Sequence, residues 1–381
     1  MGASLEVVRL FGIPVRLHWT FAPLFLWLAS THYSFDGAVN WVDLGWTMAA
    51  VTALFLCVLL HELGHALSAR RYGVKTQRIL LMPIGGLAIL DRLPDKPLHE
   101  LIVAAAGPLT NLALALVLLP FVLLLSGDNV EAIIGYWVYP QGNYFAHDAS
   151  RLDYLLVGLV ALNILVAVFN LIPAFPMDGG RILRALIAMS RPRIQATTIA
   201  VRIGQAIAVV LVFISIPAFN WLMALAAAFI FFSAAFELKL MREDYLLQHH
   251  SVGDAARYSF TKVYSTDYFG EIDDVFRYKT KDDYLFVFDE WQNFVGILDG
   301  DVMLAAIREN GESYSTQVNK AKLLHPPSLT LDDKLQNAAQ ILSDTDWKLL
   351  PVSDRNGKLV AVISKEILNR YLRSAKWKLL G

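Results

Sequence analysis

The sequence contains little cysteine and little charge. One cysteine, Cys57, occurs in 381 residues, which excludes an internal disulfide framework. Charged residues make up 18% of the chain, whereas soluble domains average about 25%. The net charge of −1 comes without a basic stripe, so the sequence predicts no nucleic-acid partner. The N-terminus also lacks a basic start followed by a cleavable apolar run, so we expect no removed signal peptide.

Apolar residues, by contrast, are in excess. They make up 56% of the chain, and the mean hydropathy is +0.46. The excess lies in residues 1–245, whereas residues 246–381 have the composition of an ordinary soluble protein. This shift predicts two domains, a membrane domain over 1–245 and a soluble domain over 246–381.

Six apolar segments predict a polytopic α-helical membrane protein with six transmembrane helices. They are Leu17–Ser30, Leu44–Ala69, Leu98–Leu125, Leu152–Ile172, Thr197–Ile216 and Phe219–Leu240. Basic residues such as Arg70, Arg184 and Lys239 gather after the second and fourth segments and at the end of the sixth. By the positive-inside rule, both termini of this multi-pass protein are expected in the cytoplasm, with the helices in the cell membrane.

Residues 76–90 are too apolar for a free loop and are interrupted by Pro83, Gly85 and Gly86. They predict a membrane-associated β-hairpin, because non-helical backbone at membrane depth needs protein or a cavity to cover it. The two glycines fit either a close backbone approach or a plain tight turn. A shorter strand and turn are expected at residues 5–18, which are rich in β-branched residues.

The second apolar segment contains a His-Glu-x-x-His run at residues 61–65. Polar groups in the hydrocarbon region cost several kcal/mol and usually mark a functional site. Residues four apart share one helix face, so His61 and His65 can bind a single metal ion. Glu62 lies about 100° around the helix, where it can act on a water at the metal without being a ligand. The competing interpretation is a chance match on a buried helix.

A hydrolytic zinc site typically has three protein ligands, so this pair needs a third. Asp178 lies at the end of the fourth segment, just before an arginine series, and therefore at a membrane depth similar to that of His61. Asp91 and Glu100 lie nearer the surface. The competing role for Asp178 is a helix cap. Cys57 could face the metal, although packing is the commoner role for a cysteine in an apolar segment.

Three motifs together resemble the site-2 protease family of intramembrane zinc metalloproteases. They are His61-Glu-Leu-Gly-His65, Gly107-Pro-Leu-Thr-Asn111 and Asn170-Leu-Ile-Pro-Ala-Phe-Pro-Met-Asp178-Gly-Gly-Arg181. The resemblance implies that His61, His65 and Asp178 bind one Zn²⁺ ion and that Glu62 activates the water. It also implies that Asn170 positions the substrate or polarises the scissile carbonyl. An interhelical hydrogen bond is the alternative role for Asn170.

The family resemblance implies an endopeptidase that cleaves transmembrane segments of membrane-anchored protein substrates in regulated intramembrane proteolysis. A helical substrate has to unwind before cleavage, and segment 76–90 could offer an edge to the unwound strand. The alternatives are a transporter-like protein with a metal site and an inactive membrane scaffold. The intact His-Glu-x-x-His run favours the enzyme.

Residues 246–381 contain two units of similar plan that resemble a pair of CBS modules, which predicts a cytosolic α/β domain. The second unit is the clearer one, with a strand, a helix at Lys334–Ser343, a hairpin at an Arg-Asn-Gly turn and a final helix. Such pairs form regulatory or dimerisation platforms, which implies a homodimer, and often bind adenine nucleotides. Ser364 is the candidate hydroxyl for a nucleotide, but Ile367 stands where the usual aspartate is expected, so nucleotide binding is left open.

Overall fold

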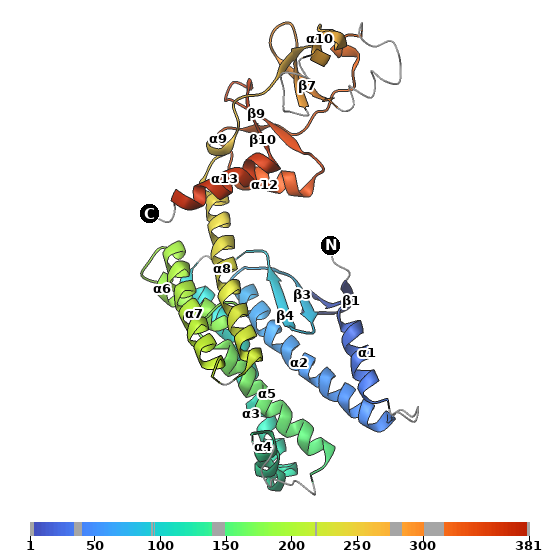
Figure 1. Cartoon of the computed structure of the whole chain (residues 1–381), viewed down its shortest axis with the longest axis vertical. Coiled ribbons are helices and arrows are strands. Elements are labelled where there is room, and N and C mark those ends of the chain that lie inside the picture. Colours follow the sequence, from blue (N-terminus) through green and yellow to red (C-terminus); the bar gives the residue numbers. More distant parts are fainter. Residues whose placement is uncertain are drawn as a thin grey trace. The chain divides into compact units, whose positions relative to one another are not determined.

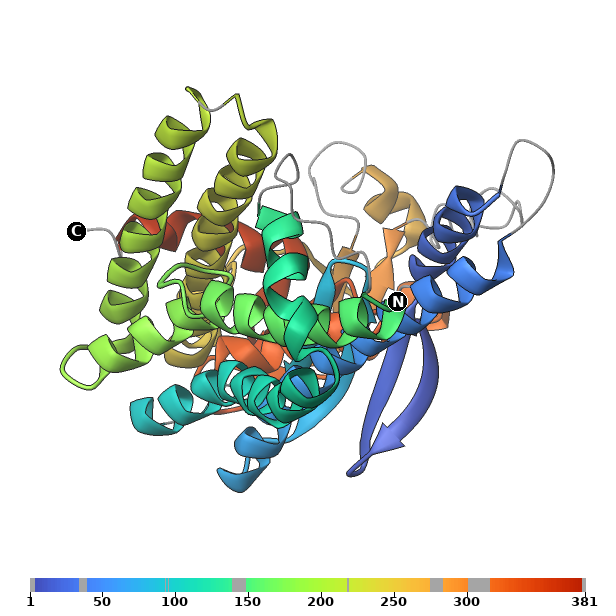
Figure 2. The same cartoon turned by 90° about the horizontal axis from the view of Figure 1, so that it is seen from below.

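The structure is a computed structural model that describes residues 4–33, 40–92, 94, 96–138, 149–217, 219–274, 284–300 and 316–378. The chain forms two compact units, Met1–Leu238 and Lys239–Gly381, and each is described by itself. Figure 1 shows the order of their elements along the chain, and Figure 2 shows the same elements from below.

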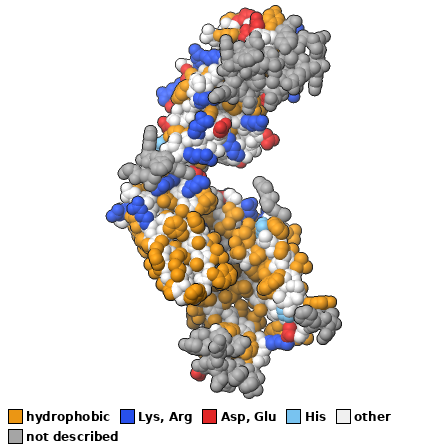
Figure 3. Space-filling view, in the orientation of Figure 1, with side chains coloured by type: hydrophobic (Ala, Val, Ile, Leu, Met, Phe, Trp, Pro, Cys, Tyr) orange, Lys and Arg blue, Asp and Glu red, His pale blue; other side chains and the backbone are white. Residues whose placement is uncertain are grey.

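Within the residues that the structure describes, five helices are long and apolar enough to cross a membrane. They are α2 (Trp41–Arg71), α3 (Pro97–Leu125), α5 (Arg151–Asn170), α7 (Arg193–Ser215) and α8 (Trp221–His249). Large apolar side chains on these helices remain exposed, for example Leu124 at 83% and Phe232 at 70%, and Figure 3 shows this unit covered with them. Such a surface fits lipid rather than water, so the chain is a multi-pass membrane protein.

The helix in the first apolar segment is shorter than predicted. Leu17 and His18 end strand β2 (Ile13–His18), and helix α1 covers Phe21–Thr31, which is 11 residues. The prediction of a helix from Leu17 was wrong at its start because Leu17 pairs with β1 on one side and with β3 on the other. A membrane-spanning helix needs about 20 residues, so the count of six spans stays a prediction.

A four-stranded sheet packs against α2. Its order is β1-β2-β3-β4, with β1 at Ser4–Leu10, β3 at Thr76–Met82 and β4 at Gly85–Leu90. The predicted hairpin of residues 76–90 is confirmed as the antiparallel β3–β4 pair, and the strand and turn at 5–18 as the β1–β2 pair. A parallel β2–β3 pairing, which was not predicted, joins the two hairpins. Buried side chains of β2 and β3 pack on Leu59 and Leu63 of α2.

The remaining elements of this unit connect its long helices. A short 3₁₀ helix, η1 (Gly127–Asn129), and helix α4 (Val130–Val138) follow α3. Helix α5 ends at Asn170, two residues before the predicted end at Ile172, and the Phe175–Pro176 bond is cis. Helix α6 (Asp178–Ala188) then starts at the candidate ligand. Helix α3 packs against α2, α5 and α6 and therefore lies between the motif helix and α6.

The second unit contains two three-stranded sheets of one plan. The first sheet holds β5 (Lys262–Tyr264), β6 (Tyr284–Phe288) and β7 (Phe294–Asp299); the second holds β8 (Leu329–Thr330), β9 (Leu349–Ser353) and β10 (Leu359–Ser364). In each, the first strand pairs parallel with the second and the second antiparallel with the third. The helical elements are α9 (Val252–Ala255), α10 (Phe269–Asp274), η4 (Val318–Lys320), α12 (Leu335–Asp344) and α13 (Lys365–Lys378). The repeated plan confirms the predicted α/β pair, and with the membrane helices it confirms the fold class.

Candidate metal centre

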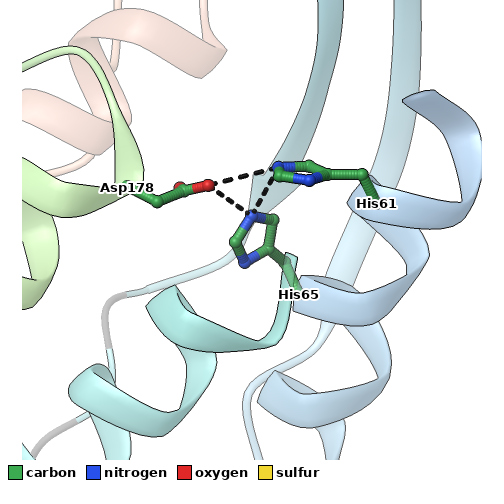
Figure 4. Close-up of side chains that lie close together, drawn as sticks. All are labelled: His61, His65 and Asp178. Carbon is green, nitrogen blue, oxygen red and sulfur yellow. Dashed lines mark hydrogen bonds and ion pairs between the residues drawn. The ribbon is translucent and has the colours of Figure 1, made fainter. Parts of the chain in front are cut away.

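Helix α2 presents the two histidines of the motif on one buried face. His61 and His65 are 6% and 5% exposed, and their ring centroids are 4.8 Å apart. Both rings turn towards Asp178, the first residue of α6, as Figure 4 shows. The spacing of four residues brings the rings together, as predicted from the helix period.

Three donor atoms converge at this point. The Oδ2 atom of Asp178 lies 3.2 Å from Nε2 of His61 and 3.1 Å from Nε2 of His65. The two Nε2 atoms are 3.2 Å apart. Asp178 is 7% exposed, so all three donors are buried. Within the part of the chain that the structure describes, this is the one group of His, Cys, Asp and Glu side chains with donor atoms close enough for a shared metal ion.

Helix α3 lies against both histidines and fixes the orientation of His65. Nδ1 of His65 lies 2.7 Å from the carbonyl oxygen of Val103, and a carbonyl can only accept. Nδ1 therefore donates, which leaves the lone pair of Nε2 directed at Asp178 and the other ring. A Cβ atom at Gly107 would lie 2.2 Å from Nε2 of His65 and 2.7 Å from Cε1 of His61, so only glycine fits there.

Two glycines after Asp178 let the preceding turn pack on the start of α6. A Cβ atom at Gly179 would lie 2.2 Å from the carbonyl oxygen of Ile172. A Cβ atom at Gly180 would lie 2.7 Å from the carbonyl carbon of Ala174. Backbone atoms cannot move aside as a flexible side chain does. Asp178 can therefore hold its position in this fold only if glycine follows it at both positions.

Glu62 is half-buried beside strand β4 rather than within the group of three donors. Its Oε2 atom accepts a hydrogen bond from the backbone amide of Ala88 over 2.8 Å. A Cβ atom at Gly86 would lie 2.6 Å from Cγ of Glu62, so Gly86 serves a close approach. Gly85, with φ +137°, serves the turn. The close backbone approach predicted for these glycines thus applies to Gly86, and the tight turn applies to Gly85.

The other candidates lie outside the three-donor group. Asn170 is half-buried at the end of α5, and its side chain makes no hydrogen bond within the described residues. Cys57 accepts a hydrogen bond from Nδ2 of Asn163 over 3.3 Å, so it does not face the candidate ligands as a donor. The hydroxyl of Ser364 accepts a hydrogen bond from the backbone amide of Ile367, in the first turn of helix α13. Ser364 therefore has a local structural role.

A buried ion network near this site was missed by the sequence reasoning. Arg184, one of the basic residues counted for the orientation of the helices, is 0% exposed and pairs with Glu100 of α3 and Glu237 of α8. The available signal was an acid, Glu100, in the first turn of an apolar helix, since a buried carboxylate needs a basic partner.

Comparison with known proteins identifies the family. The model for peptidase family M50 matches residues 49–211, which include all three candidate ligands. A zinc metalloprotease of Methanocaldococcus jannaschii is 34% identical over 67% of this chain and 66% of its own length. The structure of the site-2 protease of the same organism is 35% identical, covers 62% of this chain and 95% of that one, and has a TM-score of 0.41. The chain therefore belongs to peptidase family M50, the site-2 protease family of zinc metalloproteases.

Two further similarities concern length and the second unit. Rip3 of Mycobacterium tuberculosis is 29% identical over 58% of this chain and 53% of its own length. The chain thus spans between about half and just under two thirds of the length of these curated relatives. The structure of a CBS-pair protein, CBSX2 of Arabidopsis thaliana, is 22% identical, covers 34% of this chain and 97% of that one, and has a TM-score of 0.31.

Proposed function

We propose that this chain is a zinc-dependent endopeptidase that cleaves within the membrane, and that His61, His65 and Asp178 bind the zinc ion. The observation that carries the proposal is the convergence of their three donor atoms within 3.1–3.2 Å of one another, on buried side chains. Glu62 follows His61 on the same helix, and a backbone amide holds its carboxylate.

The residues present fit zinc. Two imidazole nitrogens and one carboxylate oxygen are the ligand types that catalytic zinc takes, with a fourth position left for water or substrate. The hydrogen bond from His65 to Val103 sets the neutral tautomer that a ligand requires. Zinc at this position would polarise the scissile carbonyl and lower the pKa of a bound water to about 7.

The chain's own residues supply the proton transfers and the orientation. The Glu62 carboxylate accepts the proton of the attacking water and passes it to the nitrogen of the leaving segment. The amide of Ala88 holds that carboxylate in one orientation before substrate arrives. The Asn170 amide donates a hydrogen bond to the scissile carbonyl oxygen, for which its nitrogen is chemically suited.

The substrates that we propose are transmembrane segments of membrane-anchored proteins, cut in regulated intramembrane proteolysis. Strand β4 is at one edge of the four-stranded sheet, next to Glu62. Amide groups alternate along a strand, so those of Gly86 and Leu90 face away from β3 together with that of Ala88. An unwound substrate can pair with this edge.

The arginine pattern supports a cell-membrane protein with cytoplasmic termini, and the composition supports domains at 1–245 and 246–381.

For the second unit we propose a regulatory platform that forms a homodimer. A cavity of about 200 Å³ lies between its two modules and is lined by Tyr284, Asp299, Trp347 and Lys348, among others. CBSX2 has been solved in a complex with AMP, and an adenine nucleotide in this cavity is the second function that we propose. Calorimetric titration of the purified chain with AMP tests this proposal. If the titration shows no heat of binding, the proposal is excluded.

The central test uses purified chain and a single-span membrane protein as substrate. Wild type should cleave it, and cleavage should stop after a zinc chelator and resume when zinc is returned. Glu62→Gln should bind zinc at wild-type stoichiometry without cleaving. Cleavage that survives either the chelator or the substitution would sink this mechanism. A chain that binds zinc and substrate but never cleaves would be a scaffold, and metal-dependent solute flux in vesicles would indicate a transporter.

A further inference from the structure

Four charged side chains from four helices meet near the metal centre. Nε of Arg184 donates to Oε1 of Glu100 over 2.7 Å, and its Nη1 donates to Oε1 of Glu237 over 2.8 Å. Nη2 of Arg193 donates to the other oxygen of Glu100 and, over 3.1 Å, to the carbonyl of Pro94. The network joins α3, α6, α7 and α8.

The network is balanced in charge, and its central Arg184–Glu100 pair is buried. The side chains of Arg184 and Glu100 are 1% and 5% exposed, and those of Glu237 and Arg193 are 29% and 33% exposed. Two guanidinium groups face two carboxylates. Removing one partner of a buried ion pair leaves an uncompensated charge, so both partners of an intact pair are held in one relative position. Such a network is suited to fixing the relative position of the helices that carry it.

The network lies at one end of a helix pair whose other end is the metal centre. On α3, Glu100 precedes Gly107 by seven residues, and Gly107 lies under both histidine rings. On α6, Arg184 follows Asp178 by six residues. At 1.5 Å per residue these intervals are about 10 Å and about 9 Å, so the two helices run antiparallel between the same two points. The Glu100–Arg184 pair therefore sets how far Asp178 reaches towards the histidines.

Arg184 also contacts the turn that leads into Asp178. Its guanidinium carbon lies 5.1 Å from the ring centroid of Phe175, which is 1% exposed and precedes Asp178 by three residues. A cation over an aromatic face is attracted to it. The same side chain thus holds the helix after Asp178 and the turn before it.

The geometry points to Arg184 as a positioning residue of the metal centre, which places the Asp178 carboxylate on the histidine pair through its bond to Glu100. This inference rests on the proposed zinc site. It assigns Arg184 no contact with substrate or with the reacting atoms. Supporting residues of this kind typically contribute about tenfold to 100-fold in metal affinity or activity.

The test is zinc affinity, measured on the purified full-length chain by competition with a chelator of known affinity. Arg184→Lys keeps the charge but loses the planar guanidinium group that bonds two carboxylates at once. This variant should bind zinc at least about tenfold more weakly. The control is Arg191→Lys at an exposed arginine, which should bind as wild type. Thermal unfolding of the zinc-free forms is compared in parallel, and should be unchanged in both variants.

A second variant decides the matter if Arg184→Lys does not fold. Glu100→Asp keeps every charge but shortens the carboxylate arm by one methylene, so it should also weaken zinc binding without lowering the melting temperature of the zinc-free protein. Wild-type zinc affinity in the folded variants overturns the inference. So does a loss of zinc that comes only with a matching loss of thermal stability, because that is the behaviour of a merely structural ion pair. If the wild type itself binds no zinc, the proposed function fails instead.

Discussion

The backbone amide of Ala88 donates a hydrogen bond to Oε2 of Glu62 over 2.8 Å. This bond joins the helix that carries the His-Glu-x-x-His motif to the edge strand of the sheet. Ala88 and Glu62 belong to separate elements, β4 and α2, and the bond fixes one orientation of the carboxylate. The proposed general base is therefore already oriented and needs little rearrangement when substrate arrives.

The first prediction follows from that bond. Ala88→Pro removes the N–H, and an edge strand tolerates proline where the N–H faces away from the sheet. Hydrogen bonds to charged groups contribute about 1.5–3 kcal/mol, so we expect kcat to fall about tenfold or more with zinc content unchanged. The measurement is the cleavage rate at saturating substrate. Ala88→Val keeps the N–H and should cleave like wild type; a fully active proline variant would contradict the orienting role.

The second prediction concerns the space beneath the histidine rings. Gly107→Ala would place a methyl carbon 2.2 Å from Nε2 of His65, and helix α3 cannot yield without moving Val103 as well. We expect zinc affinity to fall at least about tenfold, measured by chelator competition. Gly45→Ala in α2 is the matched control, because nothing lies within 4 Å of its added Cβ. It should bind zinc normally and gain up to about 1 kcal/mol of helix stability.

Much of the site could be predicted because it is encoded locally. The spacing of His61 and His65 follows from the helix period, and the hairpin follows from a proline and two glycines in an apolar run. The arginine series pointed to Asp178, whose carboxylate contacts both histidines. Each of these signals lies within a few residues of the feature it predicts.

The supporting parts of the site could not be predicted in this way. The partner of His65 is the carbonyl of Val103, a backbone atom that every residue has, so no residue type marks it. Arg184 has the same sequence context as a cytoplasmic surface arginine, and only the packing of α3 and α8 buries it. The parallel β2–β3 pairing joins segments that are separated by α1 and α2. The alternation of side chains along a strand does not indicate which other strand it pairs with.

The third prediction tests the second unit by itself. Gly357 has φ +79° in the β9–β10 turn, where a side chain adds strain. Gly357→Ala should lower the stability of this unit by about 1 kcal/mol, seen as a lower melting temperature. Gly357→Asn should recover part of the loss, because asparagine tolerates the left-handed region better. Equal melting of the alanine variant and wild type would contradict the strain argument.

The fourth prediction separates two asparagines of helix α5. Asn170 is half-buried and makes no side-chain hydrogen bond within the described part of the chain, so its amide is available to a substrate carbonyl. Asn170→Ala should lower kcat about 100-fold while zinc affinity and melting temperature stay at wild-type values. Loss of one donor to the developing negative charge is the physical reason.

The matched control is Asn163→Ala. Asn163 is 1% exposed, and its Nδ2 donates to Cys57 and to the carbonyl of Leu159. Truncation there removes two internal hydrogen bonds and leaves a gap, so it should lower the melting temperature while kcat of the folded protein stays near wild type. The two variants should therefore show opposite results in two measurements. If Asn170→Ala lowers stability and leaves kcat unchanged, Asn170 has a packing role, and the carbonyl-polarising role has to be given up.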